Sequence, residues 1–229
     1  MIKFKNSEIT PENIYKKRRS FIKSIGLGAS TLAMSTIPFV NKSLASERDK
    51  LTSYKDITTY NNYYEFGTSK SDPYRNSQIF KTTPWDIAIE GEVEKPIKLS
   101  MEEISEMFIS EERIYRLRCV EGWSMVIPWM GFSLSKLLSK VNPTNKAKFV
   151  EFESVYDPAQ MKGQRYPVLN WPYNEGLRID EAMHPLTTVV TGLYGKKLPN
   201  QNGAPLRIFI PWKYGFKSAK AIVKIKFVE

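Results

Sequence analysis

Short runs in which apolar and polar residues alternate recur through the chain, and two of the five end at Gly or Pro. These runs lie at 85–91, 112–120, 148–156, 206–211 and 221–228. Alternation with a period of two is typical of half-buried strands, because successive side chains of a strand point to opposite faces. No internal repeat and no heptad pattern accompanies the runs. The sequence therefore predicts a fold built mainly on short strands.

Two segments have helical spacing instead. Residues 99–108 place apolar side chains at roughly helical intervals behind Ser100, a candidate N-cap, and 132–141 form an apolar stripe that stops before a proline. A single helical turn is predicted at 180–183. Together with the strands, these segments predict an α+β fold, mixed and strand-dominated, with short helices.

The remaining segments are predicted to be loops. Residues 46–60 are polar and predict an irregular lead-in, and 60–67 combine aromatic and amide groups in a structured loop that ends at Gly67. Residues 157–175 hold four prolines or glycines and predict a long loop. No internal boundary is apparent, so 46–229 are expected to form one domain.

The first part of the chain has the pattern of a targeting segment. A basic block at 16–23 runs into a mildly apolar stretch at 25–40, and small residues follow at 43–45. The apolar stretch is short for a membrane span, which needs about 20 residues. We expect 1–45 to be a twin-arginine signal peptide, cleaved near Ala45, that directs a folded protein to the periplasm. An amphipathic N-terminal helix or a mitochondrial presequence is the alternative.

The net charge of +10 is concentrated in the same segment. Residues 1–45 hold eight Lys or Arg against two Glu, so six of the ten excess positive charges lie there. The remaining charge, on 46–229, forms no basic stripe of the kind that nucleic-acid binding requires. We therefore expect no nucleic-acid partner.

Cys119 is the one cysteine of the sequence, so no internal disulfide can form. Exported proteins usually carry cysteines in pairs. A single thiol in such a protein is buried and inert, bonded to another molecule, or a metal ligand. The sequence leaves these three interpretations of Cys119 open at this point.

The strand predicted around Cys119 determines which side chains share a face with its thiol. Cys119 would share a face with Tyr115 and Leu117, whereas Arg116 and Arg118 would face the other way. A glycine three residues later allows a sharp turn. A thiolate at the end of a strand suits a soft metal, although a buried inert thiol beside two surface arginines fits the segment too.

Several familiar catalytic motifs are missing from the sequence. It contains no Gly-rich phosphate loop, no HExxH, no CxxC and no GxSxG. His184 is the one histidine, which excludes a site built from several histidines. The spacing gives no support to a nucleophilic pair of Cys119 and His184, and a histidine followed by proline is more typical of a structural turn.

A group of basic residues follows the turn signal at 201–205. Its members are Arg207, Lys213, Lys217 and Lys220. Together with free backbone amides they could bind an anionic group such as a phosphate. Lysines on a solvated loop would give the same pattern.

Five motifs resemble those of the molybdopterin-dependent protein-methionine-sulfoxide reductases, a family within the sulfite-oxidase fold superfamily. They are Asn-Asn-Tyr-Tyr-Glu-Phe-Gly at 61–67, Arg-x-Arg-Cys-Val-Glu-Gly-Trp-Ser-Met at 116–125, Asp-Glu-Ala-Met-His-Pro-Leu-Thr at 180–187, Gln-Asn-Gly-Ala-Pro at 201–205 and Pro-Trp-Lys-Tyr-Gly-Phe-Lys at 211–217. The resemblance runs from the leader to Val228. It implies a sulfite-oxidase-type molybdopterin-binding domain at 46–229. Family members continue past the point that matches Glu229, so the chain is expected to be short at that end.

The resemblance implies a molybdenum-molybdopterin cofactor, with Cys119 as the protein ligand to molybdenum. Ser154 stands where the family has threonine, a change that keeps the hydroxyl. Residues 218–220 match the loop that holds the phosphate end of the cofactor. All positions that match cofactor-binding residues of the family, besides Cys119, are Asn61, Tyr64, Glu65, Ser154, Asn202, Arg207, Ser218, Ala219 and Lys220.

The resemblance also implies an activity, the reduction of methionine sulfoxide in oxidised periplasmic proteins, which repairs them to methionine. The expected partners are those oxidised proteins and a haem-binding membrane subunit that donates electrons. Two alternatives stay open. The same fold could oxidise sulfite, or the chain could be a cofactor-free exported binding protein derived from the family.

Overall fold

Two β-sheets form the framework of the domain. The computed structural model describes residues 50–229, and the ten strands of this part of the chain form two sheets of five strands each. The predicted signal peptide at 1–45, with its cleavage point near Ala45, lies outside the described residues. Within 50–229 no helix is long and apolar enough to cross a membrane.

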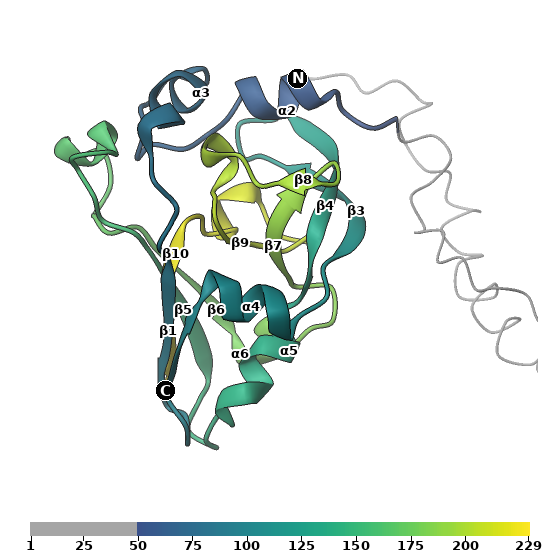
Figure 1. The fold of residues 1–229 in the computed structure, drawn as a ribbon, viewed down its shortest axis with the longest axis vertical. Helices are drawn as coiled ribbons and strands as arrows, with labels where there is room; N and C mark the ends of the chain where they lie inside the picture. The colour runs from purple at the N-terminus through teal and green to yellow at the C-terminus, as the bar shows by residue number, and fades with distance from the viewer. Residues whose placement is uncertain (1–49) are drawn as a thin grey trace, which may run out of the picture. The chain divides into compact units, whose positions relative to one another are not determined.

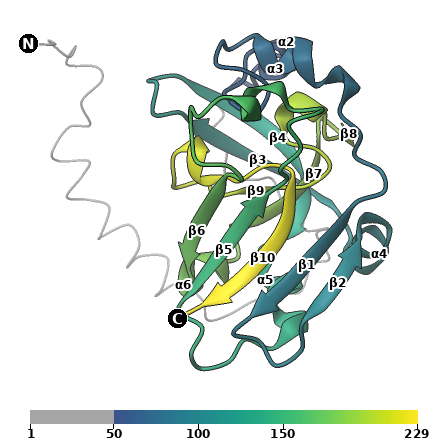
Figure 2. The same cartoon turned by 90° about the vertical axis from the view of Figure 1, so that its left-hand side faces the viewer.

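The first sheet has the strand order β2-β1-β10-β5-β6, and Figure 2 views it face-on. Its strands are β1 (Asp86–Gly91), β2 (Ile97–Ser100), β5 (Phe149–Ser154), β6 (Asn174–Arg178) and β10 (Ile222–Val228). β10 runs parallel to β1, with Ala88 opposite Lys224, while the other neighbours are antiparallel. The last strand of the described chain therefore lies in the middle of the sheet.

The second sheet is antiparallel throughout and has the order β3-β4-β7-β8, with β9 paired to β7. Its strands are β3 (Glu111–Arg118), β4 (Ser124–Ser133), β7 (Thr188–Leu193), β8 (Lys196–Lys197) and β9 (Arg207–Phe209). β3 and β4 form a hairpin whose tight turn contains Cys119. This sheet lies beside the first one in Figure 1.

The helices are short and cover the ends of the sheets, with α2 and α3 at the end far from α5 and α6 (Figure 1). In α4, Ser100 and Glu103 form a reciprocal capping box, as the predicted N-cap requires. The α-helices are α2 (Tyr54–Thr59), α3 (Asp72–Asn76), α4 (Met101–Met107), α5 (Leu134–Leu138) and α6 (Ile179–Ala182). The 3-10 turns are η2 (Ser77–Ile79), η3 (Ser139–Val141), η4 (Lys162–Arg165), η5 (Asn200–Asn202) and η6 (Gly215–Lys217).

Two apolar clusters hold these elements together. The larger one packs the inner face of the first sheet, including Ile87, Phe152 and Ile225, against short helices and against residues of the second sheet such as Val189. The smaller one, which includes Trp129 and Phe209, lies within the second sheet. Each fully buried large side chain contributes roughly 1.5–3 kcal/mol of transfer free energy to the folded state. The smaller cluster also forms the floor of the cavity described below.

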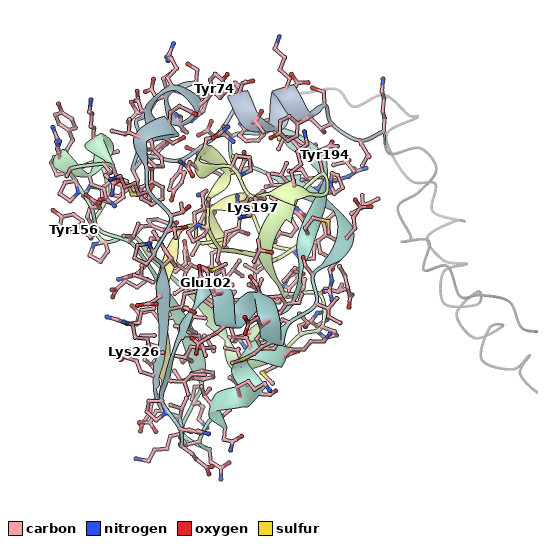
Figure 3. The ribbon with its side chains drawn as sticks, viewed as in Figure 1. Tyr74, Glu102, Tyr156, Tyr194, Lys197 and Lys226 are labelled. Carbon is pink, nitrogen blue, oxygen red and sulfur yellow. The ribbon has the colours of Figure 1, made fainter. Side chains whose placement is uncertain are left out.

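Each strand that was predicted from alternating apolar and polar residues is present in the structure. In β10, Ile225 and Phe227 are buried while Lys226 between them is exposed, and Figure 3 shows Lys226 on the outer side of the sheet. The predicted strands at 85–91, 112–120, 148–156, 206–211 and 221–228 correspond to β1, β3, β5, β9 and β10. The predicted helices correspond to α4, to α5 with η3, and to α6.

Other segments differ from their prediction. Residues 46–60 do not form an irregular lead-in throughout, because the Ser53 side chain caps α2 by accepting from the Asp56 amide. β4 was missed because it contains a proline, Pro128, which normally argues against a paired strand. Pairing of β4 with β7 begins one residue later, at Trp129 and Leu193, so the missing N–H of Pro128 breaks no bond of that ladder. β6, at the end of the predicted 157–175 loop, and β7 also gave too little alternation to be recognised.

Candidate active site

A cavity of about 330 Å³ lies where the smaller apolar cluster meets the loops around it. Its walls come from the loop at 60–65, the turn at 119–123, β4, the 201–207 segment and the 215–220 segment. The loop at 60–65, the β3–β4 hairpin and the segments after residue 200 are far apart in the sequence and meet at the cavity. The volume is within the usual range for small-molecule and cofactor sites.

The cavity brings together seven of the ten residues predicted from the resemblance. Asn61, Tyr64, Glu65, Cys119, Asn202, Arg207 and Lys220 all line it. The other three, Ser154, Ser218 and Ala219, do not line the cavity, although each is fully buried. The predicted set is therefore divided into a lining group and a buried group.

Cys119 follows the last residue of β3 and starts the turn to β4. Its amide donates to the carbonyl of Trp123 at 2.9 Å, and its own carbonyl accepts from Gly122 at 3.1 Å. Gly122 has a φ of 85°, which glycine adopts without strain. The predicted division of faces agrees with the burial, because Leu117 and Cys119 are buried whereas Arg116 and Arg118 are exposed. The thiol thus belongs to the cavity side of the hairpin.

Two cationic side chains, Arg207 and Lys220, line the cavity from the 201–207 and 215–220 segments. Arg207 is 4% exposed and donates to the carbonyls of Asn202 (2.9 Å) and Ser218 (3.3 Å). Lys220 places its ammonium 4.8 Å from the centre of the Tyr63 ring. Within residues 50–229 neither cation has a carboxylate within ion-pair distance. Both are therefore suited to bind an anion that the chain itself does not supply.

The pKa values of these groups reflect their burial. Burial lowers the pKa of Arg207 to about 10. Burial and the nearby charge of Arg207 lower the pKa of Lys220 to about 8, against the attraction of Glu65. Burial raises the pKa of Glu65, and Lys220 opposes this rise. An anion placed between Arg207 and Lys220 would relieve the repulsion between them.

Unpartnered polar atoms mark the same region. In the described part of the chain, buried side-chain nitrogens and oxygens that lack a hydrogen-bond partner belong to Asn61, Tyr63, Trp123, Trp129, Ser154, Asn202 and Ser218. Five of these residues line the cavity, and the other two are the buried serines of the predicted set. Buried polar groups are nearly always satisfied in folded proteins. The residues present therefore fit a polar, anionic group such as molybdopterin, which offers the partners that these atoms lack.

Two predicted anion-binding lysines lie elsewhere. Lys213 pairs with Glu181 at 2.6 Å, and this hydrogen bond lowers the pKa of Glu181. Lys217 pairs with Glu175 on β6. Of the four basic residues, Arg207 and Lys220 line the cavity, whereas Lys213 and Lys217 do not. The sequence could not reveal this because both glutamates are more than 30 residues away from their partners.

His184 is placed as a turn residue. Its Nδ1 accepts from the amide of Leu186 at 3.2 Å, and its ring packs edge-on against Trp212 at 4.6 Å. It does not line the cavity that holds Cys119. The geometry thus supports the structural interpretation of His184 over a pairing with Cys119.

Sequence reasoning missed several residues of the cavity. Trp129 forms part of the floor, with the Arg207 guanidinium 5.1 Å from its ring centre. The Tyr173 hydroxyl donates to Glu175 at 2.7 Å, and burial followed by this bond raises its pKa. Lys70 reaches the mouth of the cavity from outside the lining. Burial is the largest single effect and lowers the Lys70 pKa, but the hydrogen bond to Glu121 and the nearby charges of Glu121, Tyr64 and Cys119 together raise it above its ordinary value. None of these three residues lies within a quoted motif, and no other sequence signal marked them.

The fold and the site define a class of protein, the molybdopterin-binding oxidoreductases. The family described as the oxidoreductase molybdopterin binding domain matches residues 75–229. The solved sulfane dehydrogenase SoxCD from Paracoccus pantotrophus has the same fold, with a TM-score of 0.56 at 13% identity. That match covers 96% of this chain and 60% of the SoxCD chain. The predicted strand-dominated α+β fold of the sulfite-oxidase type is confirmed.

Sequence relatives place the chain more narrowly. It is 52% identical to the protein-methionine-sulfoxide reductase catalytic subunit MsrP of Xanthomonas axonopodis pv. citri, over 98% of this chain and 74% of the relative. It is 50% identical to the subunit of the same name from Burkholderia mallei, over 97% of this chain and 72% of the relative. The chain belongs to the family of protein-methionine-sulfoxide reductase catalytic subunits, which confirms the resemblance seen in its motifs.

Proposed function

We propose that the chain is a catalytic subunit that uses molybdenum-molybdopterin to reduce methionine sulfoxide in oxidised proteins to methionine. The observation that carries the proposal is the cavity itself. It joins a single thiol, two cations that have no carboxylate partner among residues 50–229 and a set of polar atoms unsatisfied within the same range. Relatives of about 50% identity are named for this activity.

The residues of the cavity divide into groups with distinct roles toward the cofactor. Cys119 would ligate the metal through its thiolate, a soft donor. The unpartnered amide oxygens of Asn61 and Asn202 would accept hydrogen bonds from the pterin. Arg207 and Lys220 would bind its phosphate, since charge-assisted bonds to phosphate are strong. When bound, molybdopterin supplies the two-electron chemistry that removes oxygen from a sulfoxide.

The mouth of the cavity favours a neutral substrate over an anion. Its lining includes Tyr60, Val120, Trp123, Leu169 and Phe216. The charged side chains there, Lys70 and Glu121, neutralise each other in an ion pair. Binding of sulfite, an anion, would require several converging arginines, and among residues 50–229 Arg207 is the one arginine that lines the cavity. An apolar rim excludes water and can contact the side chains that flank a methionine sulfoxide. These features support sulfoxide reduction and do not favour the sulfite alternative.

The cellular setting and the partner are further parts of the proposal. The basic and apolar pattern of 1–45 supports export by the twin-arginine route to the periplasm, with cleavage near Ala45. The relatives are named catalytic subunits, which implies a second subunit. We propose that this subunit binds haem, lies in the membrane and donates the electrons. Oxidised proteins are the proposed substrates.

Metal analysis combined with turnover tests the proposed function. Protein produced in a host that makes molybdopterin should contain about one molybdenum per chain, and Cys119→Ala should lose it while remaining folded. The wild type should reduce methionine sulfoxide in oxidised proteins faster than it oxidises sulfite. Full molybdenum content in Cys119→Ala would contradict the ligand assignment. Faster turnover with sulfite would favour the alternative activity.

A further inference from the structure

Three polar side chains form a clasp across the mouth of the cavity, and we refer to Lys70, Asn62 and Glu121 as the mouth clasp. The Lys70 ammonium lies 2.6 Å from Glu121 Oε1, and the Asn62 amide donates to the same oxygen at 3.1 Å. Lys70 also donates to Asn62 Oδ1 at 3.5 Å. One carboxylate oxygen thus accepts two donors from the other wall of the cavity.

The clasp acts on the turn that carries Cys119. The base of this turn is fixed by the bonds between Cys119, Gly122 and Trp123. Among the hydrogen bonds of the described residues, those from the tip of the turn to the rest of the protein all pass through Glu121. A Cβ added at Gly122 would have no atom within 4 Å, so nothing packs there. An edge-on contact of Tyr60 with Trp123 at 5.3 Å also links the turn to the facing loop.

Lys70 is itself fixed to the facing loop. Its carbonyl accepts from the Asn61 amide at 2.9 Å, and its ammonium lies 5.5 Å from the centre of the Tyr64 ring. The side chains of Lys70 and Glu121 are 23% and 30% exposed, so solvent screens their attraction only in part. A charge-assisted bond of this length is stronger than one between neutral groups. The clasp therefore joins two elements, each of which bears residues predicted to bind the cofactor.

We propose that Lys70 is a positioning residue. Through Glu121 it holds the turn of Cys119 against the loop at 61–65, and so fixes the sulfur and the width of the opening. The inference rests on the proposed function in one respect, the role of Cys119 as the ligand of molybdenum. Lys70 does not line the cavity and touches no reacting atom.

The single thiol of the chain allows a direct test without turnover. The full chain is produced without cofactor, its folding is verified by a cooperative unfolding curve, and the rate of Cys119 alkylation by iodoacetamide is measured. Lys70→Met should raise that rate several-fold, because the turn opens more often. Lys70→Arg, which keeps the positive charge, should show the wild-type rate. Lys98→Met is the matched control, since it breaks a 2.7 Å ion pair with Asp86 outside the cavity. An alkylation rate in Lys70→Met equal to that of the control overturns the proposal.

The loaded enzyme gives a second readout. The second readout uses Lys70→Met holoenzyme with wild-type molybdenum content. The EPR spectrum of its one-electron-reduced molybdenum should change, since that spectrum is sensitive to the position of the Cys119 sulfur. Lys70→Arg should keep the wild-type spectrum. In a double-mutant cycle, Lys70→Met should add little to the effect of Glu121→Gln on alkylation. Unchanged spectra or independent effects would contradict a role through Glu121. If the wild-type holoenzyme does not reduce methionine sulfoxide, the proposed function is refuted. The alkylation test of the Lys70–Glu121 contact would still be valid, because it does not depend on turnover.

Discussion

At the scale of single residues, the cavity is defined by charges that the chain leaves without a partner. Arg207 is satisfied by carbonyls, and Lys220 faces an aromatic ring, so neither has a neutralising anion among the described residues. Burying a charge without a partner is costly, and the lowered pKa of Lys220 is one expression of that cost. A bound phosphate would remove it. Cofactor binding and stability should therefore be coupled at this position.

The pH dependence of stability should show this coupling at Lys220. Its pKa falls from the ordinary 10.5 to about 8 on folding, so between these values the unfolded chain binds more protons. The unfolding free energy of the cofactor-free protein should then rise with pH across that window. The rise should be on the order of 1 kcal/mol, less than the full pKa difference would give, because solvent reaches part of the side chain and screens its charge. Lys220→Met should lack the rise. Urea unfolding at pH 7.5 and pH 10 measures it, and parallel curves for both proteins would refute the assignment.

At the scale of elements, the loop that carries three predicted cofactor residues is supported by a backbone contact. The amide of Gly163 in η4 donates to the Glu65 carbonyl at 2.8 Å. A Cβ at Gly163 would come within 1.9 Å of the Tyr64 carbonyl oxygen. Only a residue without a side chain permits this approach. The long segment between β5 and β6 thus sets the position of the cavity wall.

Gly163→Ala should disturb that wall. Because the backbone at Tyr64 and Glu65 would have to move, we expect a loss of about 1–3 kcal/mol in unfolding free energy and a lower molybdenum content. Gly176→Ala is the matched control, since its added Cβ would meet its nearest neighbour at 3.9 Å. Denaturant unfolding and metal analysis of both variants provide the measurement. Equal effects at the two glycines would show that the contact does not matter.

At the scale of the whole molecule, stability and site are carried by different parts of the fold. The larger apolar cluster packs the first sheet, which contributes Ser154 as its one predicted site residue. The cavity is built on the smaller cluster of the second sheet and on loops that meet there. A change in the first sheet should therefore lower stability without altering the site.

Ile225→Ala tests this separation. Ile225 lies fully buried in the centre of the first sheet, and its truncation should cost about 2–5 kcal/mol. Its exposed neighbour gives a control, because Lys226→Ala should change stability by about 0.5 kcal/mol or less. The molybdenum content per folded chain should stay at the wild-type level in both variants. A selective loss of metal in Ile225→Ala would show that the first sheet also shapes the site.

The sequence predicted the elements whose pattern is local. Alternation in β1, β5 and β10 and the capping box of α4 depend on neighbours within a few residues, and they were recognised. β4 was missed because its proline is tolerated only where pairing with β7 stops. Burial on both sides accounts for the missing alternation in β7, since five of its six residues are buried. Such strands are defined by their partners, which local pattern does not contain.

The sequence by itself determined that one thiol, Cys119, stands at the end of a strand, and its motifs indicated a family and a cofactor. Tertiary structure decided which cations face that thiol. Arg207 and Lys220 reach the cavity, whereas Lys213 and Lys217 are held by Glu181 and Glu175. All four basic residues look alike in the sequence. They differ because an ion pair between distant segments forms only once those segments pack together.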